Sequence, residues 1–216
     1  MDYLTIVSQL FQGMNKTIQI FFLTLLFAIP LGMLVAFGRM AKNKIVSNII
    51  KFYIAVMRGT PLMLQLIVVY FAPYYVFGMK ISSAYRFIAV IIAFTLNYAA
   101  YFAEIFRSGI EAIPVGQHEA AKILGLPKAR VFFRIILPQV IKRTLPPITN
   151  ETITLVKDTS LAFALAEIEM FTMAKQIAAQ MTTIMPLMMA GVFYFVFNFL
   201  VAFVMGKLEK KFAYYN

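Results

Sequence analysis

Long apolar stretches alternate with short basic segments along this chain. A bilayer core about 30 Å thick needs about 20 apolar residues for each helix that crosses it. Five stretches are long enough, and we expect them to be membrane spans: 17–38, 53–77, 87–106, 139–166 and 183–206. The pattern predicts an all-α integral membrane protein, residues 1–216, with one domain of five transmembrane helices.

The fourth stretch is the least apolar of the five. Six residues interrupt it: Pro146, Pro147, Asn150, Glu151, Lys157 and Asp158. Charge supports keeping it as a span. Most of the 20 Lys and Arg residues follow the first or third stretch or lie near the C-terminus, and loops rich in Lys and Arg face the cytoplasm. With five spans, all of these clusters share one side, so we expect the N-terminus outside and the C-terminus in the cytoplasm.

The start of the chain lacks the basic residues and the small-residue cleavage site of a signal peptide. We therefore expect the apolar stretch after Lys16 to be a retained span. Residues 1–15 carry apolar residues at Leu4, Ile6, Val7 and Leu10. They form either an amphipathic helix at the membrane interface or a frayed terminus.

Composition excludes several other functions. The chain is 62% hydrophobic and 13% charged, as in membrane proteins. Its net charge of +11 does not indicate nucleic-acid binding, because the basic residues lie between apolar stretches. With no Cys and a single His118, we expect no metal site. No G-x-x-x-x-G-K-[ST] phosphate loop occurs, so we expect no ATP site and no cofactor in this chain.

Polar residues within the third and fourth stretches predict a ligand pocket. Glu151, Thr154 and Asp158 lie at i, i+3 and i+7, which places them on one helical face. Asn97 and Tyr101 share a face of the third stretch with Glu104. A free amino acid needs a carboxylate for its ammonium group and donors for its carboxyl group, and an aromatic ring can contact a cation. The candidate substrate-binding residues are Glu151, Asp158, Asn97, Thr154, Ser160 and Tyr98.

Structural roles compete with this interpretation. Glu104 with Arg107, and Lys157 with a residue of another helix such as Glu104, would form ion pairs. The hydroxyls of Thr159 and Ser160 would bond to their own backbone. We favour ion pairs for Glu104, Arg107 and Lys157. For the two carboxylates of the fourth stretch we favour a pocket, because an ionised group at the bilayer centre costs about 2.5–3.5 kcal/mol and usually faces a polar cavity.

A short helix is predicted between the third and fourth spans, at 115–125. Its residues are good helix formers, and Gly125 follows where a left-handed residue would end the helix. Pro114 and Pro127 bracket it. Such a helix can dock in a groove of a partner, or it is an ordinary surface connector.

Seven residues in and after this helix resemble the EAA loop of the membrane subunits of ABC importers. They are Glu119, Ala120, Ala121, Gly125, Ile135, Leu137 and Pro138. The resemblance implies a permease driven by a separate ATPase. It also implies that 115–125 is the cytoplasmic coupling helix, which contacts that ATPase through His118, Glu119, Ala120, Ala121 and Gly125.

Three longer segments resemble the permeases of importers for polar amino acids, the group that handles histidine, glutamine, glutamate and arginine. They are RGTPLMLQL at 58–66, AEIFRSGIEAIPVGQHEAAKILGL at 103–126 and LPQVIKRTLPPITNETITLVKDTSL at 137–161. The Lys157–Ser160 run is shared by members with different substrates, so it does not select the ligand alone. The excess of carboxylates favours a cationic amino acid.

This resemblance implies a multi-pass subunit of the bacterial cytoplasmic membrane that works by alternating access and is not itself an enzyme. Its partners would be a dimer of ATP-binding subunits holding ATP and Mg, a second permease chain, for which we favour an identical copy, and an extracytoplasmic amino-acid-binding protein. Two alternatives stay open. One is an ion-coupled secondary carrier that uses Glu151 and Asp158 as ion sites. The other is a non-transporting scaffold whose cytoplasmic helix recruits a partner.

Overall fold

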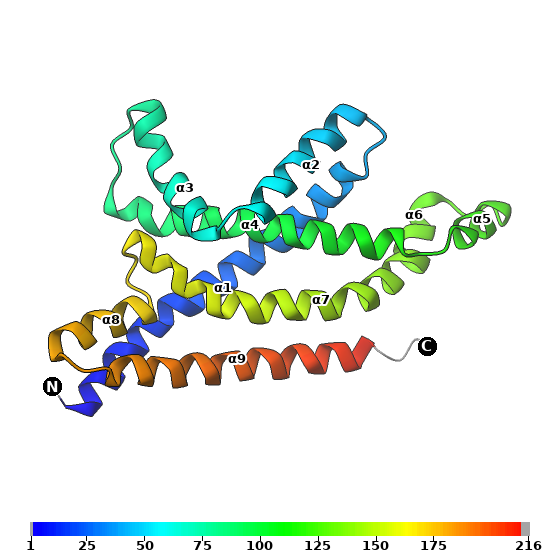
Figure 1. The fold of residues 1–216 in the computed structure, drawn as a ribbon. Helices are drawn as coiled ribbons and strands as arrows, with labels where there is room; N and C mark the ends of the chain where they lie inside the picture. The colour runs from blue at the N-terminus through cyan, green and yellow to red at the C-terminus, as the bar shows by residue number, and fades with distance from the viewer. Residues whose placement is uncertain (1, 213–216) are drawn as a thin grey trace.

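The computed structural model describes residues 2–212, and within that range the fold is made of helices and turns, without a β-strand (Figure 1). The elements are α1 Tyr3–Arg39, α2 Lys44–Gly59, α3 Leu62–Phe77, α4 Ser83–Glu111, α5 Val115–Ile123, α6 Lys128–Val131, the π-helix η1 Phe132–Ile136, α7 Leu137–Asp158, the 3₁₀-helix η2 Thr159–Leu165, α8 Met170–Met181 and α9 Met185–Phe212. The predicted all-α fold is confirmed.

The first helix is longer than predicted. Residues 3–39 form one continuous α-helix, so residues 3–15, considered above as an interfacial helix or a frayed terminus, are the first part of α1. No residue before Lys16 interrupts helical geometry, and Ile6 and Leu10 are fully buried in the core of the protein. Pro30 lies inside α1 without ending it. Met1 lies outside the described residues.

The predicted second span is two helices rather than one. α2 and α3 meet at an angle of 114°, and Figure 1 shows them leaving α4 as the two arms of a V. Thr60 is extended, with φ −123° and ψ 149°, because the ring of Pro61 disfavours helical geometry in the residue before it. The segment Gly59, Thr60 and Pro61 thus forms a sharp bend.

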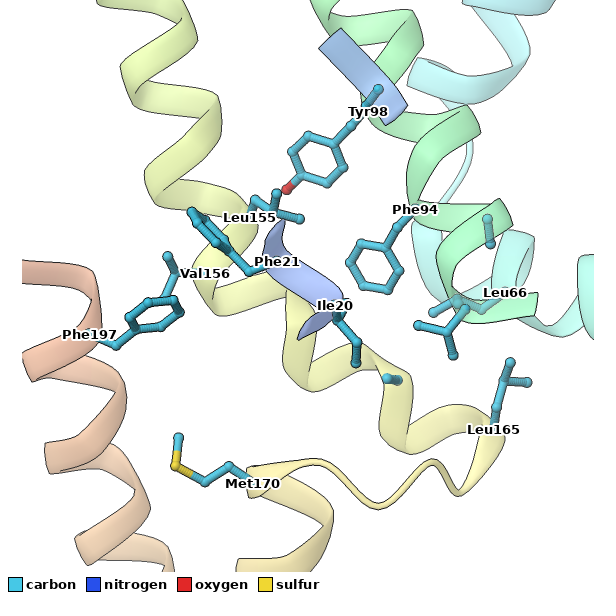
Figure 2. Packing of buried hydrophobic residues seen from close by; sticks show 14 of the residues in the cluster. Ile20, Phe21, Leu66, Phe94, Tyr98, Leu155, Val156, Leu165, Met170 and Phe197 are labelled. Carbon is cyan, nitrogen blue, oxygen red and sulfur yellow. The ribbon is translucent and has the colours of Figure 1, made fainter. Parts of the chain in front are cut away.

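The centre of the fold is the packing of α4 against α1. A Cβ added to Gly32 of α1 would lie 2.7 Å from the Cβ of Phe102, so the two backbones approach closely only because glycine is present. Figure 2 shows Ile20 and Phe21 of α1 among Phe94 and Leu155 from α4 and α7. α4, α7 and α9 run side by side (Figure 1).

The segment after α7 contains a helix that sequence patterns did not predict. α8 is preceded by its N-cap residue Glu169, whose buried carboxylate accepts hydrogen bonds from the backbone N–H groups of Phe171 and Thr172, both at 2.7 Å, and from the hydroxyl of Tyr194 at 2.9 Å. Burial raises the pKa of the Glu169 carboxyl, while these hydrogen bonds act against that rise. This N-terminal cap fixes α8 against α9.

By length and composition, three helices qualify as membrane spans: α1, α4 and α9. The bent pair α2 and α3 makes a fourth candidate if it is counted as one span. The structure therefore supports a membrane protein with three to four candidate spans among the described residues.

Candidate functional site

A cavity of about 280 Å³ lies where the break between α2 and α3 meets α4 and α7. Its lining residues are Thr60, Leu62, Asn97, Tyr98, Tyr101, Glu151, Thr154 and Asp158. The two helical faces predicted on 97–101 and 151–158 thus line the same space. Of the six candidate substrate-binding residues, the structure brings five together here.

The carboxylates in this cavity differ in how they are satisfied. Asp158 accepts a hydrogen bond of 2.7 Å from the hydroxyl of Tyr98. Glu151 is half-buried and, within residues 2–212, accepts no hydrogen bond and forms no ion pair. The hydroxyl of Thr154 is likewise unbonded within that range. One carboxylate and one hydroxyl are therefore free to bind a polar ligand.

Asn97 has a structural role as well as a place in the cavity wall. Its amide nitrogen donates to the side-chain oxygen of Gln65 at 2.9 Å and to the carbonyl of Met57 at 3.0 Å. Gln65 in turn donates to the hydroxyl of Thr60 at 2.8 Å and to the carbonyl of Met57 at 2.9 Å. These bonds tie the break between α2 and α3 to α4.

Sequence reasoning missed Gln65, Thr60 and Leu62. Gln65 is a polar residue that is 9% exposed within an apolar helix, and a buried amide must find partners. That isolated polar position was an available signal. Thr60 and Leu62 line the cavity because they flank Pro61, at the bend that lies against α4.

Ser160 is the predicted site residue that the cavity does not include. From Thr159 the chain tightens into the 3₁₀-helix η2, and the Ser160 hydroxyl donates to the carbonyl of Lys157 at 2.8 Å. Thr159 does the same to Val156 at 2.7 Å. The alternative interpretation, in which both hydroxyls bond to their own backbone, is confirmed.

Of the two ion pairs predicted beside the cavity, one forms and the other does not. Glu104 forms a close pair with Arg107, at 2.6 Å, as predicted, and lies 4.0 Å from Arg58. The proposed pairing of Lys157 with Glu104 is wrong. Lys157 is exposed and has no carboxylate within ion-pair distance among the described residues.

The predicted coupling segment is the helix α5. It begins after Pro114 and ends at Ile123, two residues earlier than predicted. Gly125 has a φ of +65°, and the N–H of Leu126 donates to the carbonyl of Ala121 at 3.0 Å, as in a helix end closed by a left-handed glycine. The prediction for Gly125 is confirmed.

The two faces of α5 have different surroundings. Ala121 is buried against Val131 and Ile136 in a small separate core. His118, Glu119 and Ala120 are exposed. His118, Ala121 and Gly125 also line a second cavity, of about 580 Å³, between α5 and the start of the next helices.

The C-terminal end of α5 carries a strongly exposed apolar surface. Ile123 is 87% exposed and Leu124 is 74% exposed. Apolar side chains at the tip of a polar loop are typical of a surface that contacts a partner.

Comparison with known proteins decides the family. Residues 28–214 match the family described as binding-protein-dependent transport system inner membrane component. The chain belongs to this family. A relative in Rickettsia conorii named for glutamine transport, GlnP, is 34% identical over 201 residues, which cover 93% of this chain and 91% of that protein. The arginine transport system permease protein ArtQ of Bacillus subtilis is 35% identical over 93% of this chain and 90% of its own.

A solved structure agrees with these relatives. A chain in the crystal structure of an amino acid ABC transporter with histidines matches 98% of this chain and 99% of its own length, with a TM-score of 0.86 and 30% identity. The predicted resemblance to ABC importer permeases is confirmed. As a member of the family, the chain is a permease subunit, and the ATPase of such a transporter is a separate subunit.

Proposed function

We propose that this permease subunit moves a cationic amino acid inward across the bacterial cytoplasmic membrane, by alternating access driven by ATP. The observation that supports this most directly is the cavity with Glu151 and Asp158 on the same face of α7. Two carboxylates in a space of about 280 Å³ favour a small ligand with more than one positive centre.

Each lining group has a role in this proposal. The unbonded carboxylate of Glu151 binds one ammonium or guanidinium group, and Asp158, positioned by Tyr98, binds the other. The unbonded hydroxyl of Thr154 donates to the ligand carboxylate. The ring of Tyr101, which already lies 5.2 Å from the guanidinium of Arg58, offers an aromatic face for a cation.

The proposed topology has five spans, with the N-terminus outside and the C-terminus in the cytoplasm. α7 with η2 serves as the fourth span although its composition is polar. The polar face of α7 lines the cavity rather than facing lipid, which is where charged residues of a span are tolerated. In this orientation the basic clusters after α1 and α4 and at the end of α9 lie on the cytoplasmic side, and α5 is a cytoplasmic coupling helix between spans three and four.

The proposed partners follow from what the chain would need for this function. A dimer of ATPase subunits would bind ATP and Mg. It would contact α5 through His118, Glu119 and Ala120 and through the exposed apolar residues Ile123 and Leu124. This chain itself would hold no cofactor and no metal and catalyse no reaction. A second permease, for which we favour an identical copy, would complete the pathway, and an extracytoplasmic binding protein would deliver the amino acid.

Reconstitution tests this function directly. The permease, its ATPase and its binding protein are placed in vesicles, and uptake of radiolabelled arginine is compared with uptake of glutamine. We expect uptake that requires ATP and an ATPase with an intact phosphate loop, with arginine preferred. Uptake driven by an ion gradient without ATP would instead indicate a secondary carrier, and a complex that assembles but never transports would indicate a scaffold.

A further inference from the structure

The beginning of α7 carries a polar contact that the pocket and the exposed tip of α5 do not explain. We propose that Gln117 and Gln139 form an amide pin that makes α5 and α7 move as one body. They would be positioning residues for transport, and this inference rests on the proposed function of α5 as the coupling helix.

The two side chains bond to each other in both directions. The amide nitrogen of Gln117 donates to the side-chain oxygen of Gln139 at 2.9 Å, and the amide nitrogen of Gln139 donates to the side-chain oxygen of Gln117 at 2.7 Å. The residues are 22 positions apart, with a turn and α6 between them. Both are half-buried, so water competes less for these bonds than on an open surface.

A third bond fixes the orientation of the pair. The amide nitrogen of Gln139 also donates to the backbone carbonyl of Ile135 at 2.7 Å. A carbonyl can only accept, so the nitrogen of Gln139 must face it, and both hydrogens of that nitrogen are then in use. The side-chain oxygen of Gln139 must therefore face the nitrogen of Gln117.

The backbone beneath Gln139 explains its position. Pro138 has no N–H, and its ring would clash with the carbonyl four residues earlier in a regular α-helix. The chain widens here into the π-helix η1, in which the N–H of Leu137 donates to the carbonyl of Phe132, five residues back. Single π turns often occur at functional sites. This turn directs the side chain of Gln139 towards α5.

The pin joins the coupling segment to the helix that carries the pocket carboxylates. α7 continues as one helix from Leu137 to Asp158, with Pro146 and Pro147 inside it. Glu151 is twelve residues beyond Gln139, about 18 Å along the axis at 1.5 Å per residue. The small core around Ala121 resists separation of α5 from α7 by packing, and the amide pair adds directional bonds that restrain their relative rotation.

Methionine substitutions test the pin in the reconstituted transporter. Gln117→Met and Gln139→Met keep side-chain length and helix propensity but remove the bonds. We expect ATP hydrolysis to stay close to that of the wild type, while substrate moved per ATP falls about tenfold. The control is Gln180→Met, because Gln180 is exposed on α8 and should leave this ratio unchanged. An unchanged ratio in both pin variants, or a parallel loss of hydrolysis, uptake and thermal stability, overturns the proposal.

Glutamate variants give an asymmetric prediction that a general loss of stability would not produce. Gln117→Glu can still accept the hydrogen bond from Gln139. Gln139→Glu can donate neither to Gln117 nor to the carbonyl of Ile135. We expect Gln117→Glu to keep most of its coupling and Gln139→Glu to lose as much as Gln139→Met. Equal losses in the two glutamate variants contradict the assigned donors.

Cross-linking tests whether the two helices move together. The chain contains no cysteine, so cysteines introduced at 117 and 139 can be joined specifically by a short bifunctional thiol reagent. We expect cross-linked transporter to retain ATP-driven uptake, and loss of uptake only after cross-linking overturns the proposal. If the unmodified transporter shows no ATP-dependent uptake, the proposed function fails. If it transports normally and the variants keep their coupling ratio, only the pin fails.

Discussion

The polar side chains at the two ends of α7 differ in how many hydrogen-bond partners they have within the protein. At the N-terminal end, Gln139 bonds to Gln117 and to a backbone carbonyl, Arg143 donates to the carbonyl of Ala112, and Thr144 donates to that of Val140. At the pocket end, Glu151 and Thr154 have no bonded partner within residues 2–212, and Asp158 has one. One end uses its polar groups to hold a geometry, while the other leaves them available to a ligand.

The difference has an energetic meaning. A polar group that is withdrawn from water without a partner destabilises the protein, so the unbonded carboxylate of Glu151 is unfavourable for folding unless a ligand cation or trapped water satisfies it. A group whose hydrogen-bonding capacity is already filled within the protein gains little from a ligand, whereas Asp158 with its single bond keeps acceptor sites. The pocket end should therefore be sensitive to loss of charge, and the N-terminal end to loss of packing and geometry.

The largest expected effect is at the pocket end. Glu151→Gln and Asp158→Asn each remove a charge while keeping side-chain shape. We expect each to lower uptake of a cationic amino acid at limiting concentration about 100-fold, because a hydrogen bond to a charged group contributes about 1.5–3 kcal/mol. Uptake by purified, assembled complex is the measurement.

Lys157→Met is the matched control for the carboxylate variants. It removes a charge next to Asp158 in sequence, but Lys157 is exposed and does not line the cavity, so uptake should stay near that of the wild type. Normal uptake by both carboxylate variants would place the ligand elsewhere and remove the contrast between the two ends.

Packing at the N-terminal end of α7 gives the next effect. A Cβ on Gly109 would lie 2.3 Å from the Cγ2 atom of Thr144, so Gly109→Ala should destabilise the contact between α4 and α7 by about 2 kcal/mol. The melting temperature of the complex measures this. Thr144→Ser removes the clashing methyl group and keeps the hydroxyl, so the double variant should recover most of the loss. A double variant no more stable than Gly109→Ala would show that the clash is relieved in another way.

A smaller effect is expected in the turn after α5. Gly125→Val places a β-branched residue at a φ of +65°, which costs on the order of 1–3 kcal/mol. The turn should relax and the amount of substrate moved per ATP should fall about tenfold. Gly125→Asn is the milder comparison, since asparagine tolerates the left-handed region better. Gly116→Ala changes a glycine with open space around it and should couple normally. Full coupling in Gly125→Val would mean that the conformation of this turn does not affect transmission.

The sequence predicted those features that depend on local pattern. α1, α4 and α9 follow from apolar length, the left-handed Gly125 from its place after a helix-forming run, and the shared face of Glu151, Thr154 and Asp158 from helical spacing. Each of these needs information from only one segment, so residue order alone was sufficient.

Features that depend on several segments were not predictable in this way. Pro61 predicts an interruption but not a bend of 114°, which depends on how Gln65 and Asn97 tie the two helices to α4. The pairing of Gln117 with Gln139 joins residues on separate elements. α8 was missed because it is short, and its start is fixed by a contact between Glu169 and Tyr194 of α9.

The smallest effect that we predict concerns the clamp at the break between α2 and α3. Gln65→Leu removes the donor that holds Thr60 at the edge of the cavity and the acceptor for Asn97. Since an uncharged hydrogen bond contributes about 1 kcal/mol net, we expect the KM for uptake to rise about fivefold. Because Gln65 and Asn97 act on the same break, adding Asn97→Ala should change KM little further. Two independent, multiplying effects would show that Asn97 contacts the ligand directly. Gln65 and Asn97 would then belong with the residues that bind the ligand. The division between residues that maintain the geometry and residues that bind the ligand would then lie within α4 and not between the two ends of α7.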